Sequence, residues 1–218
     1  GVNFAWAQIL RIATMHRMLD MYGALPYSQI SSDKLSTPYD TMEEAYHAMF
    51  TDLTDAINVM TVYVTENPNN RTMAKYDKVY DGDFEKWVKF ANSLKLRMAI
   101  RIRFADREYA RQMAEEAINH SIGVITSNED NATSLGTKNQ LYTVLVQWPD
   151  QCVSADITSY MKGYNDPRMS KYFKKKTSDK GDDDYVGMRA GLSYGNDITG
   201  PTFSRINVGE MDRTLWMS

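Results

Sequence analysis

The sequence lacks the features that define disulfide-rich, membrane-spanning and nucleic-acid-binding proteins. Only one cysteine, Cys152, occurs in 218 residues, which excludes an internal disulfide framework and any metal site built from several cysteines. No stretch approaches the ~18 consecutive apolar residues of a membrane-spanning helix. The formal net charge is −3, whereas general nucleic-acid binding requires a dense positive surface. The composition, with 43% hydrophobic and 24% charged residues, is that of an ordinary globular protein.

The two ends of the sequence also lack expected signals. No charged segment followed by an apolar segment opens the chain, so no signal peptide is recognised. Residues 1–22 already follow a helical pattern, and the final residues, RTLWMS, contain no stop signal. We interpret the sequence as a fragment trimmed at both ends.

Four helices are predicted in the first 120 residues. The first covers residues 3–22 and stops at Gly23, and the second begins with a capping box of Thr41 and Glu44. The third begins after Asp83, and its apolar stripe runs to residue 102 over roughly 30 Å. The fourth begins at Asp106, so close to the third that the two are expected to form an antiparallel hairpin.

The remainder of the chain is less regular. Residues 22–40 contain Pro26 and Pro38, which favours an extended surface crossing. After Gly123 helical periodicity becomes intermittent, the short apolar run 141–147 fits a strand or a buried helical turn, and residues 174–187 read as a loop or hairpin tip. We therefore predict a helical part over residues 1–120 and an irregular, loop-rich part with short strands over residues 121–218.

Basic residues recur through the third and fourth helices. Acidic residues follow them closely, so solvation or ion pairing is favoured over a binding role for this run. Its members are Lys95, Arg97, Arg101, Arg103, Arg107 and Arg111.

Five motifs in a fixed order resemble one known family. They are YGALPYS at 22–28, PYDTMEEAY at 38–46, GDFEKWVKFANSLKLRMAIRI at 82–102, DPRMSKYF at 166–173 and YVGMRAG at 185–191. As an ordered set they are similar to the SusD/RagB family, the glycan-capturing outer-membrane lipoproteins of Bacteroidetes. The resemblance covers residues 5–195.

This resemblance implies the fold and the setting of the protein. It implies a mainly α fold of tetratricopeptide-like stacked helix pairs, with an irregular ligand-binding part. It also implies a surface-exposed outer-membrane lipoprotein that delivers oligosaccharide or polysaccharide to a SusC-like TonB-dependent transporter. The lipidated cysteine that would anchor such a protein is absent from this sequence, so anchoring is inferred for the parent protein only.

No catalytic or cofactor motif accompanies these features. The three histidines, His16, His47 and His120, fall on three different predicted helices and form no ligand motif. No nucleophile motif or phosphate-binding loop is present, and no cofactor or metal is predicted. Two alternatives stay open: a glycosidase needs only two carboxylates at a set separation, and the acidic run 182–184 could bind calcium, although a solvated loop is favoured.

Sugar binding requires aromatic planes for the C–H faces of a pyranose and polar side chains for its hydroxyls. The pattern assigns Trp87 to the core and favours the core for Trp6. Trp148 lies outside any clean helical pattern and is a candidate platform, although burial against the scaffold explains it equally well. The predicted ligand-binding residues are therefore Trp148, Tyr142, Asp150 and Arg168, and the alternative for Arg168 is an ion pair with Asp166.

We predict a glycan-binding protein that is not an enzyme. The first alternative is a structural module that docks onto the transporter, and the second, less favoured, is a glycosidase. The shape of the pocket formed by variable loops decides which glycan, or which peptide in its place, is bound.

Overall fold

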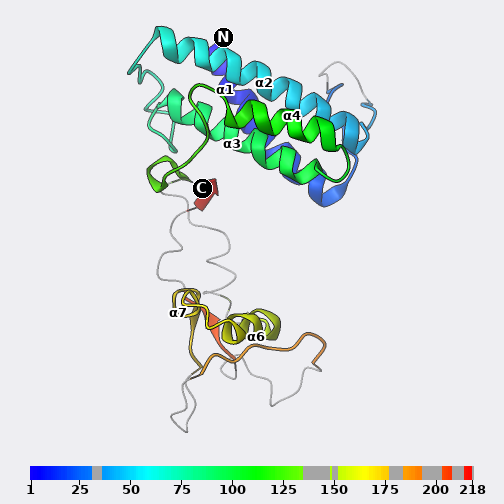
Figure 1. Cartoon of the computed structure of the whole chain (residues 1–218), viewed down its shortest axis with the longest axis vertical. Coiled ribbons are helices and arrows are strands. Elements are labelled where there is room, and N and C mark those ends of the chain that lie inside the picture. The colour runs from blue at the N-terminus through cyan, green and yellow to red at the C-terminus, as the bar shows by residue number, and fades with distance from the viewer. Residues whose placement is uncertain are drawn as a thin grey trace. The chain divides into compact units, whose positions relative to one another are not determined.

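The computed structural model describes residues 1–30, 36–134, 148, 152–176, 184–192, 203–207 and 214–217. The chain divides into two compact units, a helical unit of Gly1–Ser134 with Leu215–Ser218 and a second unit of Leu135–Thr214 (Figure 1). Among the described residues, none of the helices is both long enough and apolar enough to cross a membrane. The assignment of scaffold and ligand binding to residues 1–120 and 121–218 stays a prediction.

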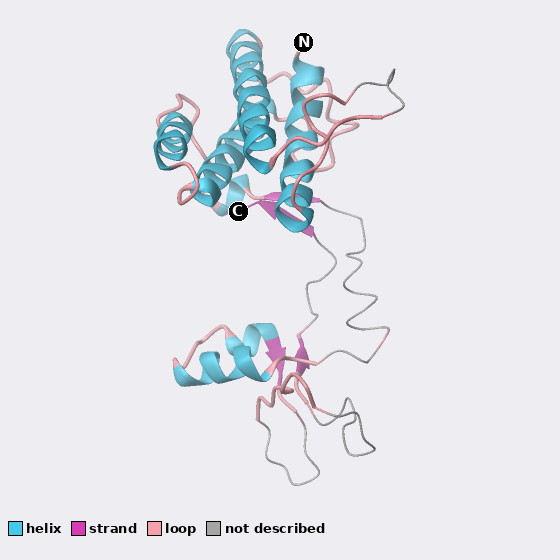
Figure 2. Ribbon diagram, turned by 90° about the vertical axis from the view of Figure 1, so that its right-hand side faces the viewer, coloured by secondary structure: helices cyan, strands magenta, loops and turns pink. Residues whose placement is uncertain are grey.

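The helical unit contains the four predicted helices. They are α1 (Val2–Tyr22), α2 (Met42–Glu66), α3 (Phe84–Ile102) and α4 (Arg107–Ile118). Helix α1 packs on α2, α2 on α3, and α3 on α4. Lys95 near the middle of α3 pairs with Glu116 near the end of α4, so these two helices form the antiparallel hairpin that the sequence predicted. Figure 2 shows the same four helices from the side.

Local capping explains where these helices begin. The Thr41 side chain accepts a hydrogen bond from the Glu44 backbone N–H, and the Glu44 carboxylate accepts one from the Thr41 backbone N–H at 2.8 Å. Asp83 and Asp106 cap α3 and α4 by accepting from backbone N–H groups three residues on. Each cap satisfies a donor that the helix itself leaves free, so the predicted starts are confirmed.

The core of the helical unit is formed by the apolar stripes that the sequence predicted. Trp87 is fully buried, and Trp6 packs against it with ring centroids 5.7 Å apart. Truncating one such side chain to alanine typically costs about 2–5 kcal/mol of unfolding free energy. The largest fully buried side chains are Trp87, Tyr27, Phe50, Phe90, Ile9, Ile12, Leu19, Met49, Leu53, Met60, Leu94 and Met98.

Several residues of the basic run pair with acidic side chains, as favoured from the sequence. Arg101 lies 3.2 Å from Asp20 of α1, and Arg111 contacts Glu108 on its own helix. Lys95, although almost completely buried, is satisfied by Glu116. The exposed pairs of Arg101 and Arg111 contribute little to stability.

Two of the five sequence motifs meet in the segment between α1 and α2. The backbone N–H groups of Tyr27 and Ser28 both donate to the Asp40 carboxylate, and the Ser28 hydroxyl donates to it at 2.6 Å. Leu25 and Asp40 form an antiparallel bridge. Asp40 therefore joins the motif at 22–28 to the motif at 38–46, and residues 31–35 of the predicted extended crossing lie outside the described residues.

The described part of the second unit is built on short elements. These are α6 (Ala155–Gly163), α7 (Met169–Tyr172), β2 (Phe173–Lys174) and β3 (Arg205–Ile206), and β2 pairs antiparallel with β3. Its small core contains Val153, Met161, Met169 and Phe173. Lys176 and Asp184 form an antiparallel bridge, as expected for a hairpin within 174–187. The apolar run 141–147 lies outside the described residues.

Short hydrogen-bonded segments complete both units. The backbone of Val153 to Ala155 exchanges hydrogen bonds with Met188, and Ser204 bonds to both Val153 and Val186. The turn η1 (Asn128–Asp130) follows α4, and then β1 (Ala132–Ser134) pairs with β4 (Thr214–Met217). The chain thus leaves the helical unit after β1 and returns to it at β4.

Candidate functional site

The four predicted ligand-binding residues are only partly covered by the structure. Tyr142 and Asp150 lie outside the described residues. Trp148 is described and 60% exposed, as a stacking platform requires. Arg168 lies in the turn between α6 and α7, and its side chain is 66% exposed. The binding role of all four stays a prediction.

Arg168 is held in place by the other charged residue of its motif. The Asp166 carboxylate accepts hydrogen bonds from the Arg168 backbone N–H and Nε at 2.9 Å, and from Nη2 at 2.6 Å. Hydrogen bonding to Arg168 lowers the pKa of Asp166 to about 2, and the same pair raises the pKa of Arg168. The ion pair considered from the sequence therefore exists. It presents a fixed, planar guanidinium to solvent, which suits recognition of oxygen acceptors.

An aromatic face on α6 was missed by the sequence reading. Tyr160 of α6 is 68% exposed, and Tyr164, the residue directly after the helix, is 81% exposed; four residues apart, they lie on the same side of its last turn. Ile157, also exposed, extends this face by one turn. We call Ile157, Tyr160 and Tyr164 the α6 face. The spacing of the two tyrosines was a signal, but the sequence reading predicted no helix in this region.

A further tyrosine lies next to Arg168. Tyr172 of α7 is about half exposed, and after Asp166 it is the next group that raises the pKa of Arg168. The motif DPRMSKYF thus combines a carboxylate, a guanidinium and an exposed aromatic ring within seven residues. Rings of this kind offer apolar area to the C–H face of a sugar, and the charged pair offers hydrogen bonds to its hydroxyls.

The groups considered for catalysis or metal binding have other surroundings. His16 is buried and contacts the Ile12 carbonyl, and burial lowers its pKa. His47 pairs with Asp106, and His120 contacts Thr61. Of the acidic run 182–184 only Asp184 is described, and it pairs with Lys162. Within the described ranges, no group of three or more His, Cys, Asp or Glu side chains is arranged to hold a metal.

The described fold and surfaces define a mainly helical protein whose second unit exposes aromatic side chains. The family model described as SusD-like, SusD and RagB outer membrane lipoprotein, matches residues 1–218. The chain belongs to this family. The resemblance read from the five motifs and the mainly α, tetratricopeptide-like fold class are both confirmed.

Solved structures of SusD homologues resemble this chain over nearly its whole length. A chitin-binding SusD homologue from Flavobacterium johnsoniae is 34% identical with a TM-score of 0.87, over 99% of this chain and 45% of its own. A SusD homologue from Bacteroides uniformis is 41% identical (TM-score 0.83), over 100% and 45% of the two chains. One from Bacteroides thetaiotaomicron is 34% identical (TM-score 0.88), over 100% and 44%.

The chain therefore spans less than half the length of these three structures. No curated protein matches it.

Proposed function

We propose that this protein binds glycans without altering them chemically, at the outer-membrane surface, and delivers them to a SusC-like TonB-dependent transporter. Membership of the SusD-like family supports this proposal. The observation that carries it is the similarity, over 99% of the chain, to a structure described as a chitin-binding SusD homologue. We infer that the parent protein is a surface-exposed lipoprotein, in keeping with the family's description.

Within the chain we place glycan binding in the part after residue 120. The α6 face and Trp148 supply exposed aromatic rings, and the Asp166–Arg168 pair supplies oriented polar groups. Tyr142 and Asp150 remain proposed members of the same site from the sequence. Pyranose rings bind to proteins through this combination of stacking area and a few placed hydrogen bonds. The helical part, residues 1–120, serves as scaffold.

A comparison of two tyrosine variants tests the proposal. Tyr164→Ala should weaken retention on immobilised chitin, or on the polysaccharide that a broad panel identifies, by roughly two- to tenfold, since one aromatic contact contributes about 0.5–1.5 kcal/mol. Tyr76→Ala is the matched control, because Tyr76 is also highly exposed, at 66%, but belongs to the helical unit. The proposal is abandoned if the protein binds no oligosaccharide in the panel.

Binding without turnover is tested separately. The protein is incubated with each glycan that it binds, and reducing ends are measured over time. We expect no release above that of a buffer blank. Release that scales with protein concentration would establish the glycosidase alternative, which requires only two suitably spaced carboxylates.

The surface at one end of the helical unit supports the alternative that the protein docks onto the transporter. A pocket of about 410 Å³ is lined there by residues from the end of α1, the start of α2 and the end of α3, including Asp20, Met42 and Arg101. Tyr22 and Phe104 lie next to these residues in the chain and are highly exposed. Large exposed apolar side chains around a hollow are typical of protein-contact surfaces. We therefore infer that this end, rather than the α6 face, contacts the transporter.

A further inference from the structure

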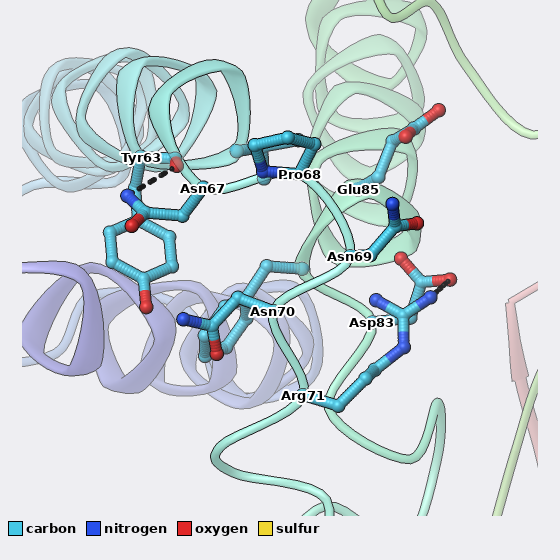
Figure 3. A pocket seen from close by; sticks show the side chains of 10 residues that line it. Tyr63, Asn67, Pro68, Asn69, Asn70, Arg71, Asp83 and Glu85 are labelled. Atoms are coloured by element: carbon cyan, nitrogen blue, oxygen red, sulfur yellow. Dashed lines mark hydrogen bonds and ion pairs between the residues drawn. The ribbon is translucent and has the colours of Figure 1, made fainter.

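A second, smaller pocket lies at the opposite end of α2, where the chain passes to α3. It has a volume of about 110 Å³ and is lined by the last turn of α2, the loop of residues 67–71 and the first turn of α3. Figure 3 shows the loop carrying Asn69 and Asn70 between the two helices. We call this smaller pocket the loop pocket.

Aromatic rings form part of its wall. Phe84, the first residue of α3, is almost completely buried, and the Tyr63 ring meets it edge to face with centroids 5.7 Å apart. Pro68 adds a further apolar surface. Because Phe84 is almost completely buried, the apolar surface open to a ligand comes from neighbours such as Tyr63 and Pro68, which can contact one C–H face of a pyranose.

The remaining lining residues include several polar ones. These differ in whether their side-chain hydrogen-bonding groups already have a partner. Arg71 Nη2 donates to Asp83 Oδ2 at 2.8 Å, so this pair is fixed (Figure 3). Asn70 Oδ1 accepts from the Thr72 backbone N–H. Within the part of the chain that the structure describes, the side chains of Asn69 and Glu85 make no hydrogen bond. An amide that can donate and accept, and a carboxylate that can accept, are therefore free to bind a ligand.

The charges around the loop pocket nearly cancel. Asp83 and Glu85 contribute two negative charges and Arg71 one positive charge. The start of α3 adds a partial positive charge of about half a unit. An anion such as phosphate would meet two carboxylates, and a free cation would meet the fixed guanidinium. A neutral ligand with both donors and acceptors matches this lining best.

We propose that the loop pocket binds one neutral pyranose unit, with Asn69 and Glu85 contacting its hydroxyl or acetamido groups. A volume of about 110 Å³ is several times the ~10–15 Å³ that a single water needs by the same measure, and so suits one ring rather than a longer chain. The inference deepens the proposed function, on which the choice of a sugar as ligand rests. It adds a contact in the helical unit, separate from the α6 face.

The test uses monosaccharides as probes. N-acetylglucosamine and D-glucose are titrated into the protein while its backbone and side-chain amide signals are followed by NMR. We expect at least one sugar to shift the signals of residues 67–71 and 83–85 with a millimolar Kd, as a single small contact of this kind allows. Asn69→Gly removes the free amide, and the Kd for that sugar should rise about tenfold. Glu85→Gln should raise it severalfold.

The chain offers a matched control for Asn69→Gly. Asn69 and Asn165 both have positive φ, 64° and 49°, so glycine retains the backbone conformation at either position. Asn165→Gly lies in the other unit and should leave the Kd unchanged. The inference is overturned if neither sugar shifts the signals of the loop pocket at 100 mM (roughly a hundred times the expected Kd). Equal effects of the two asparagine variants, or larger shifts from inorganic phosphate, would also overturn it.

These outcomes are distinguishable from failure of the proposed function. Retention on polysaccharide without any response of the loop pocket would overturn this inference alone. A response of the loop pocket in a protein that no polysaccharide retains would support it, while the proposed polysaccharide capture fails.

Discussion

At the scale of single residues, buried carboxylates organise the loops that begin the helices. Asp77 is 1% exposed and lies in the segment before α3. It accepts hydrogen bonds from the backbone N–H groups of Val79, Tyr80 and Gly82, and from Trp87 Nε1 at 2.7 Å. One side chain therefore joins the loop to Trp87, the buried tryptophan of α3. Sequence reading did not single out Asp77, because its partners are backbone groups that no motif reveals.

Asp77→Ala should lower the free energy of unfolding by about 3–5 kcal/mol, because three buried donors and one partly buried donor lose their acceptor at once. Urea-induced unfolding, followed by tryptophan fluorescence, measures this change. Asp55→Ala is the control, since Asp55 is exposed on α2, and it should change stability by less than about 0.5 kcal/mol. Similar effects of the two variants would show that the Asp77 network does not stabilise the fold.

Asp40 gives the protein a pH-dependent component of stability. Hydrogen bonds from Ser28, and then from Tyr27, lower the pKa of Asp40 in the folded state. A lowered folded pKa contributes stability above the ordinary carboxyl pKa of about 3.9, and this is lost as pH falls through the folded value. Between pH 5 and pH 2, Asp40→Asn should therefore show a shallower decline in unfolding free energy than the unmodified protein. Parallel pH profiles would contradict this assignment.

At the scale of the elements, local signals explain both what the sequence predicted and what it did not. Thr41, Asp83 and Asp106 mark helix starts through side chains that act within three residues, so the starts of α2, α3 and α4 were predictable. Helix α6 was not predicted, because only Thr158 and Met161 are buried along its nine residues. Its one aromatic residue, Tyr160, is exposed, so the helix lacks the inward apolar stripe on which helix prediction depends.

The prediction of the candidate site was limited in the same way, because only residues with a local sequence signal could be identified. Trp148 and Arg168 stood out as polar-flanked residues near turns, and both are exposed. Tyr160 and Tyr164 became candidates only once a helix placed them on one face. The loop pocket combines residues up to 22 positions apart, from Tyr63 to Glu85, and such proximity follows from packing rather than from any local pattern.

The motif YVGMRAG packs against α6, and its first glycine, Gly187, makes this close packing possible. Gly187 lies against the start of α6, and a Cβ there would overlap the Ser154 carbonyl and the Thr158 hydroxyl and lie 2.6 Å from the Ala155 Cα. The neighbouring backbone is fixed on both sides by the hydrogen bonds of Val186 and Met188. Only glycine therefore allows residues 184–192 to approach α6 this closely.

Gly187→Ala should loosen the second unit while leaving the four-helix unit intact. Overpacking of this kind costs about 1–3 kcal/mol or more. Hydrogen exchange measured by mass spectrometry should show faster exchange in residues 152–176 and 184–192, with α1 to α4 unchanged. Gly163→Ala is the matched control, because a Cβ there meets no atom within 4 Å, and it should be neutral or slightly stabilising. Unchanged exchange in Gly187→Ala would refute the close contact.

At the scale of the whole molecule, the two proposed roles belong to different units of the chain. Glycan contact is assigned to Trp148 and the α6 face in the second unit, and transporter contact to the end of the helical unit around Phe104. Residues assigned to separate units and sharing no partner are expected to act additively. Variants of each unit should therefore affect one activity and spare the other.

Phe104→Asp should reduce co-purification of the protein with its SusC-like transporter, because it places a charge where an 88% exposed aromatic ring would enter the interface. Its retention on the bound polysaccharide should not change. Trp148→Ala should do the opposite, weakening retention while co-purification stays at the level of the unmodified protein. Val62→Asp controls for adding a charge to any exposed apolar position of the helical unit, since Val62 on α2 is also exposed. If Phe104→Asp and Val62→Asp co-purify equally well, the docking surface lies elsewhere. If Trp148→Ala loses the transporter, glycan binding and docking share one surface.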